Sequence, residues 1–421
     1  MPKNLALSRF ANSRLLALFA VLLSLGLAGC TTLKSPAASS DWPSAFHDSG
    51  RTNSTAEEIT TPLVSVWSKD LAPVAFNKGM KRIQLSSPAI SGGVLYVGST
   101  DRRLYAFELA TGRRLWRFEA DGAIESSPTV TETKVCFGSS GGFFRCLDKS
   151  EGRELWSFRA KSEITGSALD GTGGPDGKGL IYLYSADDRL YALDSATGER
   201  VWVYSRTPFF TVSRRIISSP ASDAETGRIY QLFSDGALVA LDATTGSVLW
   251  EKQVIEDFWE ALEARRTPIV DGKALYIIDG NSSVLALNSV DGTERDIETA
   301  DHATDIVLSD KQLLVAGTSS ISLLDRRGAK LLWKKELERG SITTLIVAGN
   351  KIVLLSAYEY EPAGIGFLAR ERGYLEVLSL KNGSSIWAKS LKGTVTAGAS
   401  VGNGAIALFR NDGLLSLYTQ K

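Results

Sequence analysis

Catalysis by a metal or a nucleophile would have very few side chains to use in this chain. Histidine occurs only twice, at His47 and His302, so a histidine-based metal cluster cannot be assembled. A Ser-His-Asp triad would need one of these two, and no Gly-x-Ser-x-Gly sequence marks a nucleophile. Each histidine lies next to an aspartate, Asp48 or Asp301, in a predicted loop. We interpret both as turn or packing residues, and we predict no catalytic residue, no metal site and no enzyme activity.

A glycine-rich segment, residues 171–179, also has residue types that could bind a ligand. It contains Gly177-Lys178-Gly179, but a phosphate-binding loop needs Ser or Thr after the lysine and a different glycine spacing. Asp170 and Asp176 could bind calcium there, although the pattern matches a calcium loop only weakly. Gly, Pro and Asp are also ordinary turn residues, which favours a flexible loop.

Two long segments, residues 206–216 and 255–266, combine aromatic side chains with arginine. This is the composition of a hot spot in a protein interface. The residues concerned are Phe209, Phe210, Arg214 and Arg215 in the first segment, and Phe258, Trp259, Arg265 and Arg266 in the second. A third segment, residues 358–373, mixes Tyr, Phe and charge. The alternatives are that the aromatics cap the fold and that the third segment is an extended hairpin.

The amino terminus has the architecture of a signal peptide that ends at a cysteine. Basic residues are followed by the apolar run 15–25, which is too short to span a bilayer as a mature helix. The run ends in Leu27-Ala28-Gly29-Cys30, which looks like a bacterial lipobox. We expect cleavage of residues 1–29, lipidation of Cys30 and a flexible tether over 30–41. Thr31 after the cysteine favours the outer membrane, and the alternative is an ordinary signal peptide with a chance cysteine.

The elements that position these segments come from one repeated phrase. Residues 191–202 read as a short strand, a turn closed by Gly198 and a second strand ending in Trp202. Related phrases end at Trp116, Trp156, Trp250, Trp333 and Trp387. Repeats of this length with four short strands are typical of a β-propeller, and eight copies can be aligned. The 39 glycines and nine tryptophans fit such a many-turned all-β chain.

The last repeat stops at Lys421 without its closing Trp strand. An orphan copy of that strand, residues 63–71, precedes the first repeat. If it pairs with the segment 405–418, the chain ends share one blade and the ring closes, which removes the exposed sheet edges. We therefore predict an eight-bladed propeller over residues 42–421, closed by an N-terminal strand that completes the last blade.

Within each blade, a tyrosine and an alanine recur ten residues apart, as at Tyr182 and Ala192. Partners at this offset face each other across a hairpin, so a large side chain meets a small one. In the second blade, Cys136 and Cys146 take the two positions. Because the expected compartment is oxidising, a disulfide is one prediction. Two buried free thiols are the alternative, and the spacing is not that of a redox motif.

The phrase Leu-Tyr-Ala-Leu-Asp-x-x-Thr-Gly-x-x-x-Trp resembles the pyrroloquinoline-quinone (PQQ)-like propeller repeat over almost all of residues 42–421. With the lipobox and the lead-in from Asp41 to Asn53, the chain resembles the BamB family of propeller lipoproteins. This resemblance implies a non-catalytic scaffold for β-barrel outer-membrane protein assembly, anchored by lipid and facing the periplasm. It implies a BamA-like partner and unfolded outer-membrane clients, and a monomer within a complex. Balanced charge, 47 basic and 47 acidic residues, gives no indication of nucleic-acid binding.

The resemblance also implies partner contacts in the loops that enter the fourth and fifth blades. Arg215 occupies the position of the family's loop arginine, and Val212 partly matches the apolar residues before it. In the next loop, Glu263 matches one family acid and Arg265 replaces the other, which puts the contact or its partner in doubt. The alternatives are another binding role in the envelope and a PQQ-dependent quinoprotein dehydrogenase. The chain lacks the adjacent cysteines of that enzyme family, so we expect no cofactor.

Overall fold

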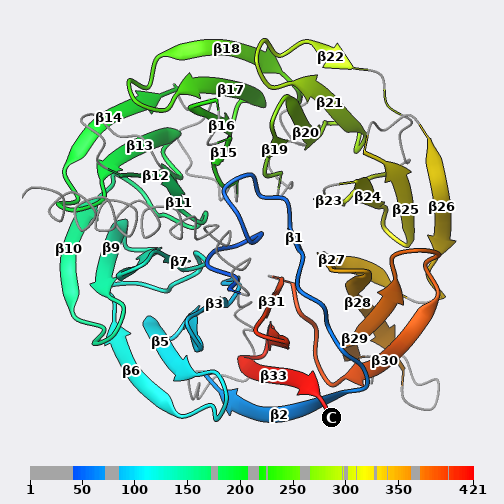
Figure 1. Cartoon of the computed structure of the whole chain (residues 1–421). Helices are drawn as coiled ribbons and strands as arrows, with labels where there is room; N and C mark the ends of the chain where they lie inside the picture. The colour runs from blue at the N-terminus through cyan, green and yellow to red at the C-terminus, as the bar shows by residue number, and fades with distance from the viewer. Residues whose placement is uncertain are drawn as a thin grey trace, which may run out of the picture. The chain divides into compact units, whose positions relative to one another are not determined.

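The computed structural model describes part of the chain in detail. The described residues are 41–71, 85–171, 179–206, 218–223, 226–256, 266–295, 297, 302–309, 311–326, 330–338, 340–361, 370–396 and 398–421. They form eight sheets arranged as a ring, with one sheet per blade, and all pairs of neighbouring strands are antiparallel except one in blade 7 (Figure 1). The prediction of an eight-bladed propeller is therefore confirmed. Cys30 and the segments 1–29 and 30–40 lie outside the described residues.

In the first four blades, the chain runs from the innermost strand to the outermost strand through four consecutive strands. Blade 1 contains β3 (Ala89–Ser91), β4 (Val94–Gly98), β5 (Arg103–Glu108) and β6 (Arg114–Glu119). Blade 2 contains β7 (Thr129–Val130), β8 (Lys134–Gly138), β9 (Phe143–Asp148) and β10 (Glu154–Arg159). Blade 3 contains β11 (Leu169–Gly171), β12 (Leu180–Ser185), β13 (Arg189–Asp194) and β14 (Arg200–Ser205). Blade 4 contains β15 (Ala221–Asp223), β16 (Arg228–Leu232), β17 (Ala237–Asp242) and β18 (Val248–Gln253).

The next three blades follow the same order. Blade 5 contains β19 (Ile269–Asp271), β20 (Ala274–Ile278), β21 (Val284–Asn288) and the short β22 (Glu294–Arg295). Blade 6 contains β23 (Asp305–Leu308), β24 (Gln312–Ala316), β25 (Ser320–Asp325) and β26 (Leu331–Glu336). Blade 7 contains β27 (Ser341–Ala348), β28 (Lys351–Tyr360), β29 (Arg370–Ser379) and β30 (Ser385–Leu391), with β1 (Ser54–Thr55) added in parallel to β27.

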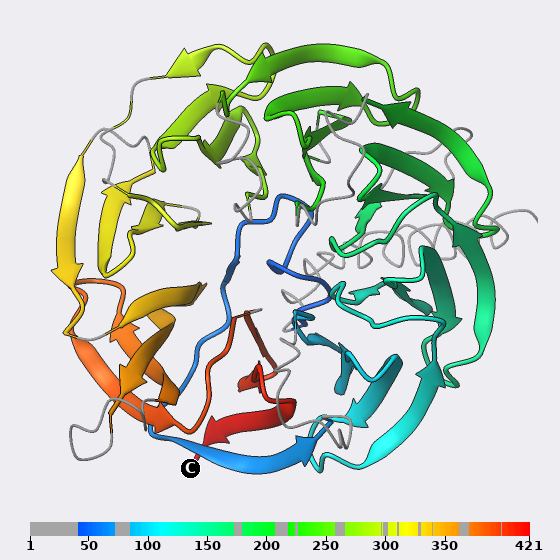
Figure 2. The same ribbon diagram turned by 180° about the vertical axis from the view of Figure 1, so that it is seen from behind.

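The two ends of the chain close the ring in blade 8. This blade contains β31 (Ala399–Gly402), β32 (Ala405–Phe409), β33 (Leu414–Gln420) and, as its outermost strand, β2 (Leu63–Asp70). Strand β2 pairs antiparallel with β33 from Leu63 opposite Gln420 to Asp70 opposite Leu414. The predicted closure by the orphan N-terminal strand is confirmed, and Figure 2 shows β2 and β33 side by side from behind.

The repeated phrase builds both the turn within each blade and the contact between blades. The Asp194 carboxylate accepts hydrogen bonds from the backbone N–H groups of Ala196 (2.8 Å) and Thr197 (2.9 Å), which folds the turn. Gly198 follows at φ +75°, a backbone conformation that favours glycine. Its Cα lies against the indole of Trp156 from the previous blade, whose Nε1 donates to the Ser195 carbonyl at 3.1 Å. The Trp of one blade therefore packs on the turn of the next.

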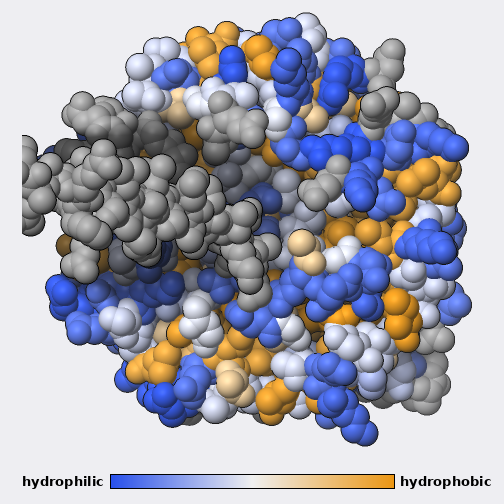
Figure 3. Space-filling view, viewed as in Figure 1, coloured by the Kyte–Doolittle hydropathy of each residue, from blue (hydrophilic) through white to orange (hydrophobic). Residues whose placement is uncertain are grey.

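This contact recurs around the ring. The pairs of a tryptophan and the glycine beneath it are Trp67 and Gly112, Trp116 and Gly152, Trp202 and Gly246, Trp250 and Gly292, and Trp333 and Gly383. Trp387 faces blade 8, where the corresponding turn is replaced by the two ends of the chain, and it packs against the buried cluster of that blade. The outermost strands that contain a Trp also expose at least one apolar residue beside it, such as Leu249 and Ile386. Hydrophobic groups accordingly recur among hydrophilic ones around the ring (Figure 3).

The predicted cross-strand pairing of tyrosine and alanine is confirmed in the register of the hairpins. Tyr96 lies opposite Ala106, and the same holds for Tyr182 and Ala192, Tyr230 and Ala240, and Tyr276 and Ala286. Each tyrosine hydroxyl donates to a carbonyl in the next blade, and in three blades the Trp donates to the same carbonyl. These shared acceptors are the carbonyls of Lys149, Ala243 and Ser289.

In blade 2, Cys136 lies opposite Cys146 and a disulfide joins them, with their Cα atoms 4.1 Å apart. Both cysteines are fully buried. The pair leaves this blade without a tyrosine hydroxyl, and Lys134 donates instead to the Ser195 carbonyl that also accepts from Trp156. The carbonyl in the next blade therefore still accepts two hydrogen bonds, with Lys134 in place of the tyrosine.

Before β2, residues 41–58 cross the central opening of the ring (Figures 1 and 2). We call this segment the strap. It makes hydrogen bonds to the inner part of every blade. The partners in the order of blades 1 to 8 are Ile90, Val130, Ala168, Ser222, Val270, Leu308, Val347 and Gly404. The opening is therefore bridged by the chain itself.

Arg51 is the most deeply buried charged residue of the strap, with no exposed surface. Its guanidinium donates to the carbonyls of Pro220 (2.9 Å), Ala45 (2.9 Å) and Ala168 (3.0 Å). Burial lowers the pKa of Arg51 to about 10, against the opposite effect of Asp48, so the side chain is charged at neutral pH. It ties blades 3 and 4 to the strap through charge-assisted hydrogen bonds.

Candidate protein-interaction site

Two loops whose composition indicates a protein interface leave the ring at the same end. Residues 207–217 connect β14 of blade 3 to β15 of blade 4, and residues 257–265 connect the next pair of blades. The predicted contact residues Phe209, Phe210, Val212, Arg214, Arg215, Phe258, Trp259, Glu263 and Arg265 all lie outside the described residues. The structure does describe the four points where the loops begin and end, and these decide how the loops are held.

The two loops end next to each other on the inner side of the ring. Ser218 follows the first loop, and its hydroxyl donates to the carbonyl of Arg266, which follows the second loop, at 3.1 Å. One residue further along, the N–H of Ser219 donates to the hydroxyl of Thr267 at 3.4 Å. The inner stems of the two loops are therefore held as one unit.

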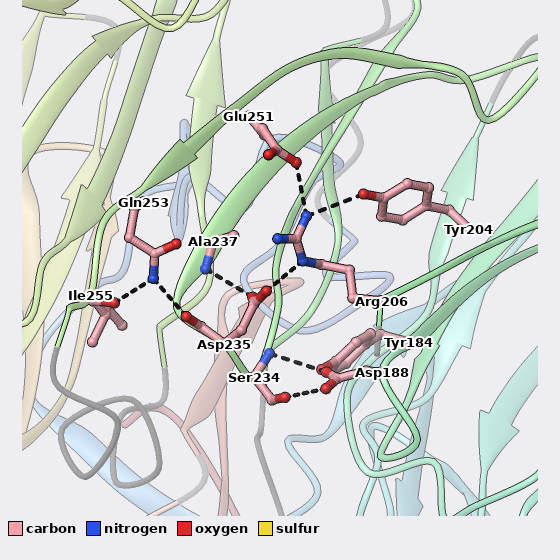
Figure 4. Close-up of polar contacts among 10 residues, drawn as sticks. All are labelled: Tyr184, Asp188, Tyr204, Arg206, Ser234, Asp235, Ala237, Glu251, Gln253 and Ile255. Atoms are coloured by element: carbon pink, nitrogen blue, oxygen red, sulfur yellow. Dashed lines mark hydrogen bonds and ion pairs between the residues drawn. The ribbon is translucent and has the colours of Figure 1, made fainter. Parts of the chain in front are cut away.

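The outer stems are joined by Arg206, the last described residue before the first loop (Figure 4). Its Nε donates to Asp235 at 2.6 Å, and its Nη1 donates to Glu251 at 2.8 Å and to the Tyr204 hydroxyl at 3.2 Å. Asp235 lies in the turn between β16 and β17, and Glu251 lies on β18. One arginine thus connects the end of blade 3 to a turn and to the outermost strand of blade 4.

The electrostatics of this contact keep the arginine charged. Partial burial acts to lower the pKa of Arg206, but the hydrogen bonds to Asp235 and Glu251 outweigh it and raise that pKa. The side chains of Arg206 and Asp235 are about one fifth exposed, at 21% and 23%. A partly shielded ion pair with two acceptors holds its geometry better than a fully exposed pair.

Gln253 continues the network to the second loop. Its side-chain amide donates to the carbonyl of Asp235 at 2.6 Å and to the carbonyl of Ile255 at 2.7 Å (Figure 4). Ile255 is fully buried and lies two residues before the second loop. The turn that contains Asp235 therefore accepts hydrogen bonds from Arg206, just before the first loop, and from Gln253, shortly before the second loop.

Asp188 anchors the base of the same network. Its carboxylate accepts from the Tyr184 hydroxyl and from the N–H and hydroxyl of Ser234, and its carbonyl accepts from the N–H of Arg206 at 3.1 Å. Burial, reinforced by the nearby Asp188 charge, raises the pKa of Tyr184 well above its usual value, so its hydroxyl stays protonated and donates. Phe233 packs between the rings of Tyr184 and Tyr204.

This arrangement provides a rigid base at the points where the two loops begin and end. Among the described residues, no group of three or more His, Cys, Asp or Glu side chains could hold a metal ion. His47 packs against Trp42 with ring centroids 4.8 Å apart, and His302 is exposed in a loop. In the described part of the chain, no helix has the length and apolar character to cross a membrane.

The sequence pattern did not reveal the stem network. Asp188, Ser234 and Asp235 are residue types that are common in any turn, and Arg206 is one arginine at the start of a long segment, so their types alone indicate no contact. A partial signal was available, since an arginine directly after an outer strand and an acid in the next blade's hairpin turn occupy fixed positions in the repeat. The contact between them depends on how neighbouring blades are placed.

The ring of eight blades defines the class of the protein as a β-propeller. A family model described as "Outer membrane protein assembly factor BamB" matches residues 64–174 and 146–320, more than half of the chain. The chain belongs to this family. A curated relative, the outer membrane protein assembly factor BamB of Nitrosomonas eutropha (strain DSM 101675 / C91 / Nm57), is 24% identical over 158 residues, which is 37% of this chain and 35% of the relative. The match therefore spans about a third of that relative's length.

Solved structures share the fold at low sequence identity. The crystal structure of BamB from Moraxella catarrhalis has a TM-score of 0.62 and 19% identity, covering 86% of this chain and 98% of that one. The quinohemoprotein alcohol dehydrogenase ADHIIG from Pseudomonas putida HK5 has a TM-score of 0.66 and 13% identity, covering 90% of this chain and 80% of that one. The fold is therefore shared by BamB and by an alcohol dehydrogenase, and it does not by itself decide the function of this chain.

Proposed function

We propose that the protein is a non-catalytic scaffold for the assembly of β-barrel outer-membrane proteins, held at the periplasmic face of the outer membrane by a lipid on Cys30. The observation that carries the proposal is the shared base of the two loops, residues 207–217 and 257–265, in a chain of the BamB family. The partner is a BamA-like assembly protein, and the clients are unfolded outer-membrane proteins.

The rigid base is what a scaffold requires. Binding through a loop costs conformational entropy when the loop becomes ordered, and this cost falls when both ends of the loop are already fixed. Here, the Ser218–Arg266 contact fixes the inner ends, and the network of Arg206, Asp235 and Gln253 fixes the outer ends. The ends of both loops therefore lie on one base, which supports a role for the two loops together in binding one partner.

The strap supports a role without a quinone cofactor. Residues 41–58 bridge the centre of the ring and hydrogen-bond to the inner part of every blade. A planar quinone placed at this level would have to displace Arg51, whose guanidinium already satisfies carbonyls of blades 3 and 4. The residues that surround the centre of the ring therefore do not fit a quinone cofactor.

The proposal is tested by recovering the partner from membranes with the full-length protein. Arg215→Glu is expected to reduce recovery of the BamA-like protein at least several-fold, because it reverses a charge in the predicted hot spot. Arg200→Glu is the matched control, because Arg200 is exposed at the other end of blade 3. Equal recovery with both variants would argue against the loop assignment.

A second measurement addresses the enzyme alternative directly. The purified protein is incubated with PQQ and calcium, and its absorbance spectrum is recorded after gel filtration. We expect no cofactor to co-elute with the protein. Stoichiometric uptake of PQQ would overturn the proposal of a non-catalytic scaffold.

A further inference from the structure

The hairpin of blade 7 extends beyond the body of its sheet. Strand β27 pairs with β28 only as far as Ser341 opposite Ala357, and β30 pairs with β29 only as far as Leu391 opposite Gly373. Strands β28 and β29 continue together for three more pairs, up to Tyr360 opposite Arg370. We call residues 358–361 and 370–372 the arm. Both backbone edges of the arm lack a neighbouring strand among the described residues.

A groove follows the β28 edge of the arm. It is lined by Gly340, Ser341 and the residues from Ala357 to Glu361. Gly340 has a φ of +75° and directly precedes β27, and it packs so closely on the Ala357 carbonyl that any side chain there would collide with it. The edge of β28 from Tyr358 onward therefore borders an open groove in which one more strand could extend the sheet.

The arm has two chemically different faces, because side chains alternate along a strand. Glu359 and Glu361 share one face with Glu371, which lies directly opposite Glu359. Tyr358 and Tyr360 point to the other face with the arm's arginines. There, the Arg372 guanidinium lies 4.0 Å from the centre of the Tyr360 ring.

The acidic face is not neutralised within the described part of the chain. Like charges directly opposite each other on antiparallel strands are destabilising, and Glu359 and Glu371 form such a pair. The nearby arginines, Arg370 and Arg372, lie on the other face of the hairpin. Glu359, Glu361 and Glu371 are exposed. A strand added along β28 would place every second side chain beside Glu359 and Glu361, where a basic residue would be favoured.

We propose that the β28 edge of the arm binds an extended segment of a partner protein by strand addition, and that this segment carries Lys or Arg at alternate positions. The backbone edge supplies main-chain hydrogen bonds, and the acidic face selects the basic side chains. In this sheet order, the β28–β29 turn lies at the same end of the ring as the connections between blades. The arm therefore projects from the same end as the two loops of the candidate site, but from a different blade.

The test uses the full-length protein in detergent and a fluorescein-labelled peptide of ten alternating Lys and Val residues. Binding is measured by fluorescence anisotropy, and hydrogen exchange by mass spectrometry reports protection of the β28 edge. The double variant Glu359→Gln and Glu361→Gln is expected to weaken binding about tenfold, since each exposed charge contributes modestly. The matched control, Glu132→Gln with Glu199→Gln, removes the same charge from exposed sites in turns of other blades and should bind as the wild type does.

Two further peptides separate strand addition from simple charge attraction. A Lys-Val peptide with N-methylated alternate residues keeps its charge but cannot pair fully, and it should lose most of the binding. A Glu-Val peptide should not bind. Equal binding of the N-methylated and unmodified peptides would overturn the proposal, as would protection of segments other than β28, or absence of binding by the Lys-Val peptide. Self-association of the protein through the arm, seen as a dimer in gel filtration, would also overturn it.

Discussion

The contact between Trp156 and Gly198 provides a quantitative test of how blades are joined. Gly198 has a φ of +75°, and a Cβ added to it would collide with the Trp156 indole. Gly93 has the same φ of +75°, but a Cβ there would meet nothing within 4 Å. The substitutions Gly198→Ala and Gly93→Ala therefore share the backbone effect and differ in the contact with tryptophan.

The expected magnitudes follow from these two differences. Placing alanine at a left-handed φ costs about 1–2 kcal/mol at either position. At Gly198, the indole must also move, which adds about 1–3 kcal/mol for overpacking. Loss of the hydrogen bond from Trp156 to the Ser195 carbonyl, 3.1 Å long, adds about 1 kcal/mol more. Gly198→Ala should therefore lower the free energy of unfolding by about 2–4 kcal/mol more than Gly93→Ala does.

The assay is equilibrium unfolding in urea, followed by far-ultraviolet circular dichroism. A double-mutant cycle isolates the contact, because Trp156→Leu removes the ring that the new methyl group would meet. In that background, Gly198→Ala should cost little more than Gly93→Ala, which gives a coupling energy of about 2–4 kcal/mol. The reasoning would be refuted if the two glycine substitutions were equally destabilising, or if Gly198→Ala cost the same with and without Trp156.

Two other predictions concern the disulfide and a turn carboxylate. Replacing Cys136 and Cys146 with serine should lower the free energy of unfolding by about 2–3 kcal/mol, because the bond restricts the unfolded chain, although the short loop that it closes keeps the effect modest. Urea unfolding with and without dithiothreitol checks this, and a wild-type protein insensitive to reductant would contradict it. Burial acts to raise the pKa of Asp242, but hydrogen bonds from Thr245 and Thr244 outweigh it and lower the pKa below the usual value of an aspartate. The contribution of the Asp242 carboxylate to the free energy of unfolding should be complete above the usual aspartate pKa and lost as the pH falls through the lowered pKa. Asp242→Asn should therefore reduce the loss of stability at acid pH. An unchanged dependence of the free energy of unfolding on acid pH would count against this.

The ring and the register of its hairpins could be predicted from the sequence because the repeat places the same residue types at the same positions. The tyrosine and alanine offset predicted the hairpin pairs, and the orphan strand ending near Leu71 predicted the closure. These features depend on local periodicity, and each copy of the repeat supports the others.

The burial of Arg51 and the loop stems could not be predicted in the same way. Arg51 contacts Ala168 and Pro220, which are 117 and 169 residues away in sequence. The repeat does not indicate that an arginine before the first blade will donate hydrogen bonds to backbone carbonyls so far away in the sequence. The Arg206–Asp235 contact likewise joins two blades, and it depends on the angle between them. The residues predicted to contact a partner remain predictions, because they lie outside the described part of the chain.

The strap changes how stability is shared among the blades. In an ordinary repeat array, each unit contacts only its neighbours, so units can open individually and stability is close to a sum of local terms. Here, one segment of the chain, residues 41–58, bonds to all eight blades. The strap precedes all eight repeats in the sequence. Its hydrogen bonds are nevertheless complete only when the last blade has folded. Loss of a single blade therefore also disturbs a segment shared by the other seven, and the ring should unfold more cooperatively than its repetitive sequence alone would suggest.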